Sequence, residues 1–139
     1  MRDDLVKVLA EGGHSLVVRN ETVSVYDGHG ITDLYRLLRY EPEMLRGGIA
    51  ADKVVGKAAM ALMMLGGVRE VYAAVISDLA LSLAERSTVA VSYGKRVGHI
   101  ARKDGTGWCP LEFLCKECAT AGECLAEIDK FMYADKPCE

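Results

Sequence analysis

The chain has 139 residues, of which 50% are hydrophobic and 27% are charged, and this balance is typical of one globular domain with a sizeable core. Its formal net charge of -3 gives no electrostatic basis for binding nucleic acid or a membrane surface. No stretch reaches the ~20 apolar residues of a membrane span, and Met1 is followed by charged residues, so we expect a cytoplasmic protein.

The first predicted elements are a helix, a hairpin and a second helix. Apolar residues recur on one side of a helix over 2–11, and two glycines end it. The segments 14–19 and 22–26 are short apolar runs separated by a tight turn, which indicates a β-hairpin. Thr32 is a suitable N-cap for a helix over 33–40.

The stretch from Gly47 to Gly67 is bracketed by pairs of glycines and consists mostly of good helix formers. Because its apolar residues occur nearly all round, it predicts one buried central helix. Asp52, Lys53 and Lys57 are the exceptions, and all three lie in its first half. Polar groups that break a local pattern in this way often mark a functional site.

The rest of the chain alternates strands and helices, which predicts an α/β fold with three α/β/α layers and a mixed sheet. We expect a single domain over 1–139, with a core of about 2–112 and a cysteine-rich helical tail of about 113–139. The predicted elements are a strand over 68–76, a helix over 79–86 capped by Ser77-Asp78, a strand over 88–93, a short edge strand over 99–102, a helix opened by Pro110 and a final helix over 123–133.

Two motifs, GIAADKVVGKAA at 48–59 and DGTGWCPLE at 104–112, together with the order of elements, resemble a small prokaryotic family of unknown function with a cytidine-deaminase-like fold. Zinc deaminases carry a His-Ala-Glu or Cys-Ala-Glu triplet at the start of the second core helix and Pro-Cys-x-x-Cys after the next strand. Placed on this sequence, these motifs fall at 50–52 and near 77–80, where only the acid Asp52 survives. The resemblance therefore implies the fold and the location of the site, with no zinc beside Asp52 and no cofactor.

The leading hypothesis is a zinc-independent enzyme, or a binder, of a nucleoside- or nucleotide-like small molecule; the ligand class follows from the resemblance alone. Asp52 would accept a proton, and Lys53, one helical turn before Lys57, would contact the substrate. Cys109 precedes a predicted helix and would be the nucleophile. We expect one cleft to hold Asp52 and Cys109, with ligand contacts from Lys57, Gly48, Ser77, Gly107 and Glu112.

Each of these residues also has a purely structural interpretation. Asp52 can cap a helix while Lys53 and Lys57 extend to solvent. Cys109 can be a buried thiol beside Trp108. The sequence leaves open whether the protein is an enzyme.

Two other classes of function remain open. Cys115, Cys118 and Cys124 contain one C-x-x-C pair, which favours a zinc or iron–sulfur site or a redox sensor as an alternative to the small-molecule site. The last alternative is a non-enzymatic interaction module that pairs through a sheet edge or an apolar helix face, including a homodimer.

Overall fold

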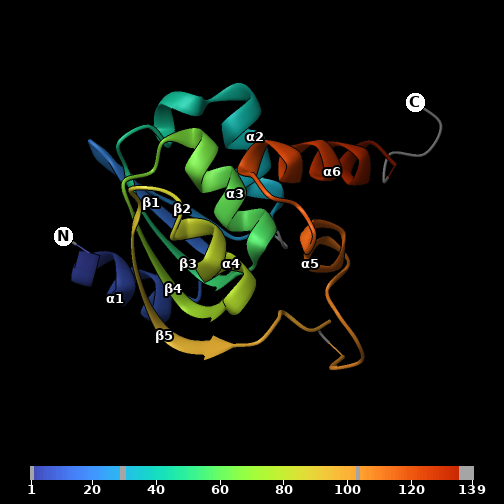
Figure 1. Ribbon diagram of the computed structural model, residues 1–139. Helices are drawn as coiled ribbons and strands as arrows, with labels where there is room; N and C mark the ends of the chain where they lie inside the picture. The colour runs from blue at the N-terminus through green and yellow to red at the C-terminus, as the bar shows by residue number, and fades with distance from the viewer. Residues whose placement is uncertain (1, 29–30, 103, 135–139) are drawn as a thin grey trace.

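The computed structural model describes residues 2–28, 31–102 and 104–134. They form one five-stranded mixed sheet with helices on both faces (Figure 1). The strands are β1 Leu16–Asn20, β2 Thr22–Tyr26, β3 Ile49–Val55, β4 Glu70–Ser77 and β5 Ala90–Val97. The helices are α1 Arg2–Gly12, α2 Thr32–Tyr40, α3 Lys57–Gly66, α4 Asp78–Ala84, α5 Pro110–Cys115 and α6 Ala121–Ala134, with a short 3₁₀ helix at Pro42–Met44.

The sheet combines an antiparallel hairpin with a parallel half. Its strand order is β2-β1-β3-β4-β5; β1 runs antiparallel to β2 and β3, whereas β3, β4 and β5 run parallel. Parallel neighbours need a crossover, and α3 and α4 supply the two crossovers. The hairpin turns at Glu21, whose φ of 59° is left-handed.

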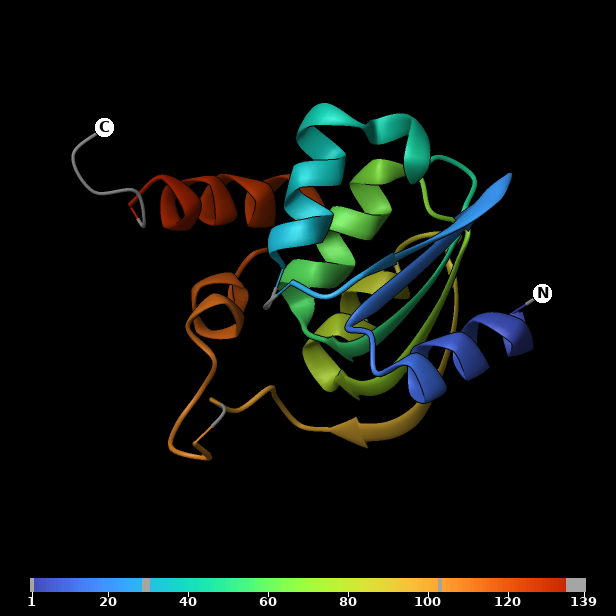
Figure 2. The same ribbon diagram turned by 180° about the vertical axis from the view of Figure 1, so that it is seen from behind.

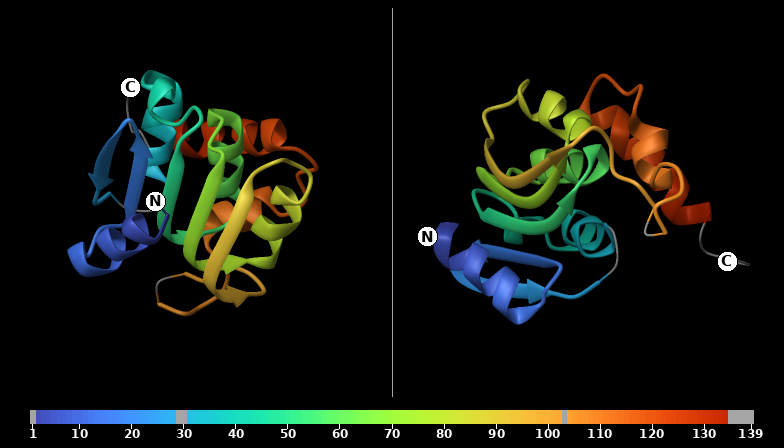
Figure 3. Two further views of the ribbon diagram at one scale, coloured as in Figure 1. Left: turned by 90° about the vertical axis from the view of Figure 1, so that its left-hand side faces the viewer. Right: turned by 90° about the horizontal axis from the view of Figure 1, so that it is seen from below.

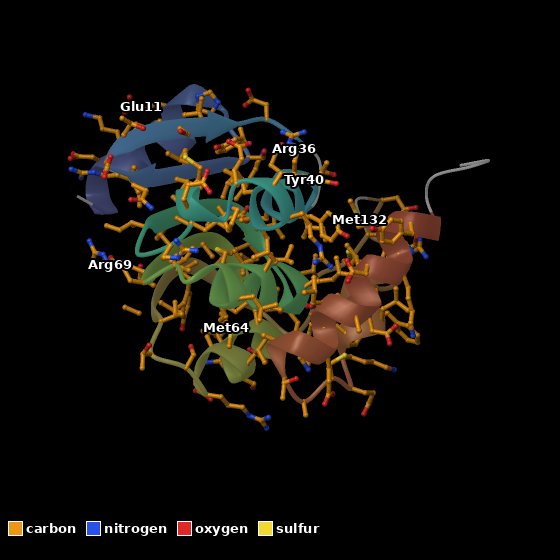
Figure 4. The ribbon with its side chains drawn as sticks, turned by 90° about the horizontal axis from the view of Figure 1, so that it is seen from above. Glu11, Arg36, Tyr40, Met64, Arg69 and Met132 are labelled. Atoms are coloured by element: carbon orange, nitrogen blue, oxygen red, sulfur yellow. The ribbon has the colours of Figure 1, made fainter. Side chains whose placement is uncertain are left out.

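The two faces of the sheet are covered unequally. Helix α1 packs on β1 and β3 through Leu5 and Leu9, which contact Val17 and Ala51. The other long helices cover the opposite face, where α3 is the buried centre and contacts α2, α4, α5 and α6 (Figure 3). Asp129 of α6 accepts hydrogen bonds from side chains of α2, so these two helices lie together, with Met132 of α6 on the side of α2 (Figure 4).

The prediction of one helix from Gly47 to Gly67 is wrong for its first half. Residues 49–55 form the central strand β3, and α3 begins only at Lys57, after Gly56. Local composition favours a helix, but pairing with β1 on one side and β4 on the other decides the structure, since strand preference depends strongly on neighbouring strands. The end of the expected helix is confirmed, because Gly67 caps α3 with a φ of 84°.

Most other predicted elements are confirmed within a few residues. The Ser77 hydroxyl caps α4 by accepting a hydrogen bond from the Ala80 N–H at 3.1 Å. Two differences concern the last strands: β5 continues to Val97, and the expected edge strand over 99–102 is reduced to a single bridge between Ala101 and Trp108. None of the helices in the described parts of the chain is long and apolar enough to cross a membrane.

Candidate functional site

A cavity of about 690 Å³ opens at the end of the sheet where β3 finishes; we call it the Asp52 cavity. Its walls come from the end of β3, the beginning of α3, the loop after β5 and the start of α5. Ligands of open α/β sheets bind at this carboxyl edge of the parallel strands. The polar residues in its lining are Ser15, Asp27, Asp52, Lys53, Arg102, Cys109 and Glu112.

Asp52 places a buried carboxyl on the wall of this cavity. It lies on β3 between Leu16 of β1 and Ala73 of β4, and only 7% of its surface is exposed. The Val54 N–H donates a long hydrogen bond of 3.3 Å to its Oδ1. Burial raises the pKa of Asp52 to about 7, and the backbone N–H groups of Val54 and Lys53 offset only part of that shift. Near neutral pH this carboxyl therefore exchanges a proton readily.

Glu112 is the second buried carboxyl on the cavity wall, and its oxygens are occupied by the protein itself. It is 2% exposed and accepts hydrogen bonds from the backbone N–H groups of Lys57, at 2.7 Å, and Ile100, at 3.0 Å. A carboxylate at the beginning of α3 also interacts favourably with the positive end of that helix. Glu112 thus holds α5 and the loop after β5 against the first turn of α3, which Figure 2 shows beside α5.

Cys109 lies half-buried in the same cavity, directly before α5. Its N–H donates to the Ile100 carbonyl at 2.9 Å, and the next residue is Pro110. Helix α5 has only six residues, so its dipole contributes little, and access from the cavity is what makes this thiol available to a ligand. Trp108, the residue before Cys109, stacks on His99, with ring centroids 4.2 Å apart.

The two lysines do not share one helix face as the sequence predicted. Lys53 lies on β3, is exposed and lines the cavity, on the opposite side of the strand from Asp52 because successive strand residues alternate. Lys57 is 7% exposed, and its Nζ donates to the carbonyls of Lys116, at 3.2 Å, and Cys118, at 2.5 Å. Its side chain therefore extends to the far end of α5 and is not part of the cavity lining.

Three further predicted contacts lie away from the cavity. Gly48 precedes β3, where a side chain would meet the Arg19 carbonyl at 3.0 Å, so its role is close packing. Ser77 is fully buried as the cap of α4. Gly107 adopts a φ of 72° and lines a separate shallow hollow beside Trp108. His29, which lies between two glycines after the hairpin, falls outside the described residues.

The cavity also includes polar residues that the sequence did not single out. Ser15 and Asp27 belong to the hairpin ends, and Arg102 belongs to the loop after β5. The Asp27 carboxylate pairs with His14 Nδ1 at 2.8 Å and is largely exposed. Only the position of Asp27 directly after an alternating strand could have indicated it, since strand ends meet at one edge of a sheet.

The C-terminal cysteines form a second polar feature, the thiol cluster of Cys115, Cys118 and Cys124. Their sulfur atoms all lie within 4.8 Å of one another. A hydrogen bond from Cys115, together with the nearby Lys57 ammonium, lowers the pKa of Cys124 to about 7, and the same hydrogen bond raises the pKa of Cys115. Burial raises the pKa of Cys118. Cys138 lies outside the described residues.

The sequence and the fold were both compared with those of known proteins. The TM1506 family, described as a domain of unknown function (DUF1893), matches residues 4–132. Among solved structures, the fold is similar to that of a DUF1893 family protein from Thermotoga maritima, with 24% identity, a TM-score of 0.86 and coverage of 94% of this chain and 88% of that chain. No curated protein matches the sequence. Because the matched region spans nearly all of the described residues, the chain belongs to the DUF1893 family.

Proposed function

We propose that the protein binds a nucleoside-like small molecule in the Asp52 cavity, with Asp52 as the group that recognises the base and exchanges a proton with it. The observation that carries this proposal is a buried carboxyl, with a pKa of about 7, on the wall of a cavity of about 690 Å³. Pockets for small ligands have volumes of roughly 300–1,000 Å³ and combine an apolar lining with a few polar groups. Perturbed carboxyl groups in such clefts are candidates for function.

The chemistry of Asp52 suits the hydrogen-bonding edge of a nucleobase. As a carboxylate it accepts two N–H groups, and as an acid it donates one hydrogen bond and accepts another. Both forms are populated near neutral pH, so the same side chain can give a proton to a ring nitrogen or take one away. Lys53 and Arg102, which line the cavity and are exposed, are suited to contact a phosphate if the ligand is a nucleotide.

The resemblance to the cytidine-deaminase fold supports the ligand class but not the zinc reaction. With α3 beginning at Lys57, its first turn offers no His or Cys, and the Ser77–Ala80 start of α4 offers none either. The carboxylate at the start of α3 is that of Glu112, which already accepts the Lys57 N–H. These residues do not fit a deaminase zinc ion, and we derive no step that uses one.

The Cys109 thiol provides a test of whether the protein only binds its ligand or also converts it. Recognition of a base needs Asp52 alone, whereas a covalent reaction would also use the Cys109 thiol on the same cavity wall. A Cys109→Ser variant that binds the ligand but no longer converts it would identify an enzyme. Conversion that continues unchanged in this variant would remove Cys109 from the chemistry.

The binding proposal is tested by thermal unfolding of the protein with a panel of free nucleobases, nucleosides and nucleoside monophosphates. We expect at least one compound to raise the melting temperature, since a ligand that binds the folded state stabilises it. Asp52→Asn should lower the affinity for that compound roughly 10–100-fold, because a charge-assisted hydrogen bond is lost. Asp104→Asn, which changes an exposed carboxyl outside the cavity, should bind as the parent does. Failure of the whole panel, or equal binding by Asp52→Asn, would overturn the proposal.

A further inference from the structure

The thiol cluster is independent of the Asp52 cavity and has a different chemistry. Cys115 is the last residue of α5, Cys118 lies in the turn that follows, and Cys124 is in the first turn of α6. Cys115 and Cys124 are completely buried, whereas Cys118 is half-buried. Three soft sulfur ligands from two helix ends and their connecting turn therefore converge on one point with one side open to solvent.

The backbone holds these thiols in place. The Cys118 N–H donates to the Cys115 carbonyl at 3.0 Å, which closes the C-x-x-C turn. The Cys124 N–H donates to the Thr120 carbonyl at 3.1 Å, and the Thr120 hydroxyl caps α6 by accepting from the Glu123 N–H at 3.1 Å. Because both ends of the connection are fixed, the sulfur atoms meet without any long flexible loop between them.

A buried positive charge accompanies the cluster. Lys57 donates from Nζ to the carbonyls of Lys116 and Cys118, which both belong to the C-x-x-C turn. A buried ammonium needs a counter-charge, and thiolates beside it would provide one. With three thiolates, one ammonium and one divalent cation, the group as a whole would be electrically neutral.

We propose that Cys115, Cys118 and Cys124 bind one zinc ion, with Lys57 as the charge-balancing residue next to it. Zinc bonds to thiolate sulfur at about 2.3 Å in a tetrahedron, which places the sulfur atoms about 3.8 Å apart. The present spacing of up to 4.8 Å needs only a closure of about 1 Å. Binding forms three Zn–S bonds, releases the thiol protons to solvent, and leaves the fourth position to water on the open side at Cys118.

Zinc suits this site better than the other metals that thiolates bind. Iron–sulfur clusters generally use four cysteines, and the described residues bring three together. Cys109 is at the opposite end of α5, on the order of 9 Å further along the helix, and lines the Asp52 cavity instead. Copper(I) carries one positive charge less, so with three thiolates and Lys57 it would leave a buried negative charge.

The test is metal binding by the full chain, reduced and stripped with a chelator, in the parent and in matched cysteine variants. After zinc is added and the excess removed, we expect one zinc per chain. Cobalt(II) in place of zinc should give the absorption of a tetrahedral thiolate complex. Cys118→Ser should lower zinc affinity by more than about 100-fold, because a ligand is lost at the least buried position. Cys109→Ser, outside the cluster, should bind as the parent does.

Variants of Lys57 test the charge balance separately. Lys57→Met should lower the zinc affinity roughly 10–100-fold, which is the usual effect of removing a residue that supports metal ligands. Lys57→Arg, which keeps the positive charge, should restore most of that affinity. Circular dichroism of each variant verifies that it folds. The proposal is overturned if the reduced parent binds no zinc, if it takes up iron–sulfur or copper in preference, or if Cys118→Ser binds zinc as tightly as Cys109→Ser.

Discussion

Two carboxyl groups are buried on the wall of one cavity, yet their surroundings differ in every respect that matters for function. Glu112 receives two short backbone hydrogen bonds at the start of α3. Asp52 has only weak backbone partners within its own strand, such as the Val54 N–H at 3.3 Å, and burial raises its pKa to about 7. Glu112 is therefore part of the framework, whereas Asp52 retains hydrogen-bonding capacity toward the cavity.

The difference shows why burial of an acid alone does not indicate a functional group. A buried acid whose oxygens are already bonded stabilises the fold, and removing it leaves donors unpaired. A buried acid with weak partners destabilises the ionised protein, a cost that a functional role would explain. The hydrogen-bond partners of the carboxyl group therefore separate the two cases, and variants of Glu112 and Asp52 test this separation.

The largest effect is expected for Glu112→Ala. The change leaves the N–H groups of Lys57 and Ile100 buried without their acceptor and removes two charge-assisted hydrogen bonds, so stability should fall by about 4–6 kcal/mol. Chemical denaturation measures this loss. Glu112→Gln, which keeps one carbonyl oxygen, should lose less, and the exposed Glu117→Ala should lose little. A loss below about 1 kcal/mol for Glu112→Ala would mean that the framework assignment is wrong.

The next effect concerns pH and Asp52. The folded pKa of about 7 lies above the ordinary aspartate pKa of 3.8, so the folded state binds the proton more tightly than the unfolded state does. Stability is therefore lost as pH rises from near 4 to near 7 and stays reduced above that window. Relative to Asp52→Asn, which does not ionise, the parent should lose about 3 kcal/mol between pH 5 and pH 8.

Denaturation curves of both proteins at several pH values measure this difference. If the parent and Asp52→Asn respond to pH identically, Asp52 has an ordinary carboxyl pKa. The ligand proposal would then lose its main physical support.

The smallest effect is expected for Gly56→Ala. An added Cβ would lie 2.9 Å from Oε1 of Glu112 and 3.1 Å from Cγ1 of Ile100. The backbone φ of -97° is ordinary, so only crowding counts, and it should cost about 1–2 kcal/mol. Gly98→Ala is the matched control, because a Cβ there meets no atom within 4 Å. Equal stability of the two variants would show that Glu112 has room to move.

Much of the fold could be predicted because its signals are local. The alternating hairpin, the Ser77 cap and the terminal helices each depend on residues close in sequence. The boundary between β3 and α3 could not, since the alanines of 49–55 suit a helix and only pairing with β1 and β4 makes them a strand. Gly56 was the one local indication of that break.

The same contrast between local signals and long-range contacts applies to the candidate site. Flanking glycines and fold-level resemblance suggested that Asp52 and Cys109 would line one cavity, and they do. The direction of Lys57 depends on whether it is in a helix interior or at a helix start, so the boundary error misplaced it as well. Glu112 was expected to contact a ligand, but its carboxylate accepts the first N–H of α3, a contact between residues 55 positions apart.

Lys57 has a consequence for the order in which the chain can acquire its structure during synthesis. Its backbone N–H donates a hydrogen bond to Glu112, and its ammonium group donates to the carbonyls of residues 116 and 118. A nascent chain that ends before these residues has the sheet but no acceptor for either group. At the usual 5–20 residues per second, roughly 3–12 seconds of translation separate the appearance of α3 from that of its partners. Until then the central helix α3 begins with the unpaired Lys57 ammonium. We therefore expect the ribosome-bound intermediate to keep the start of α3 in contact with water.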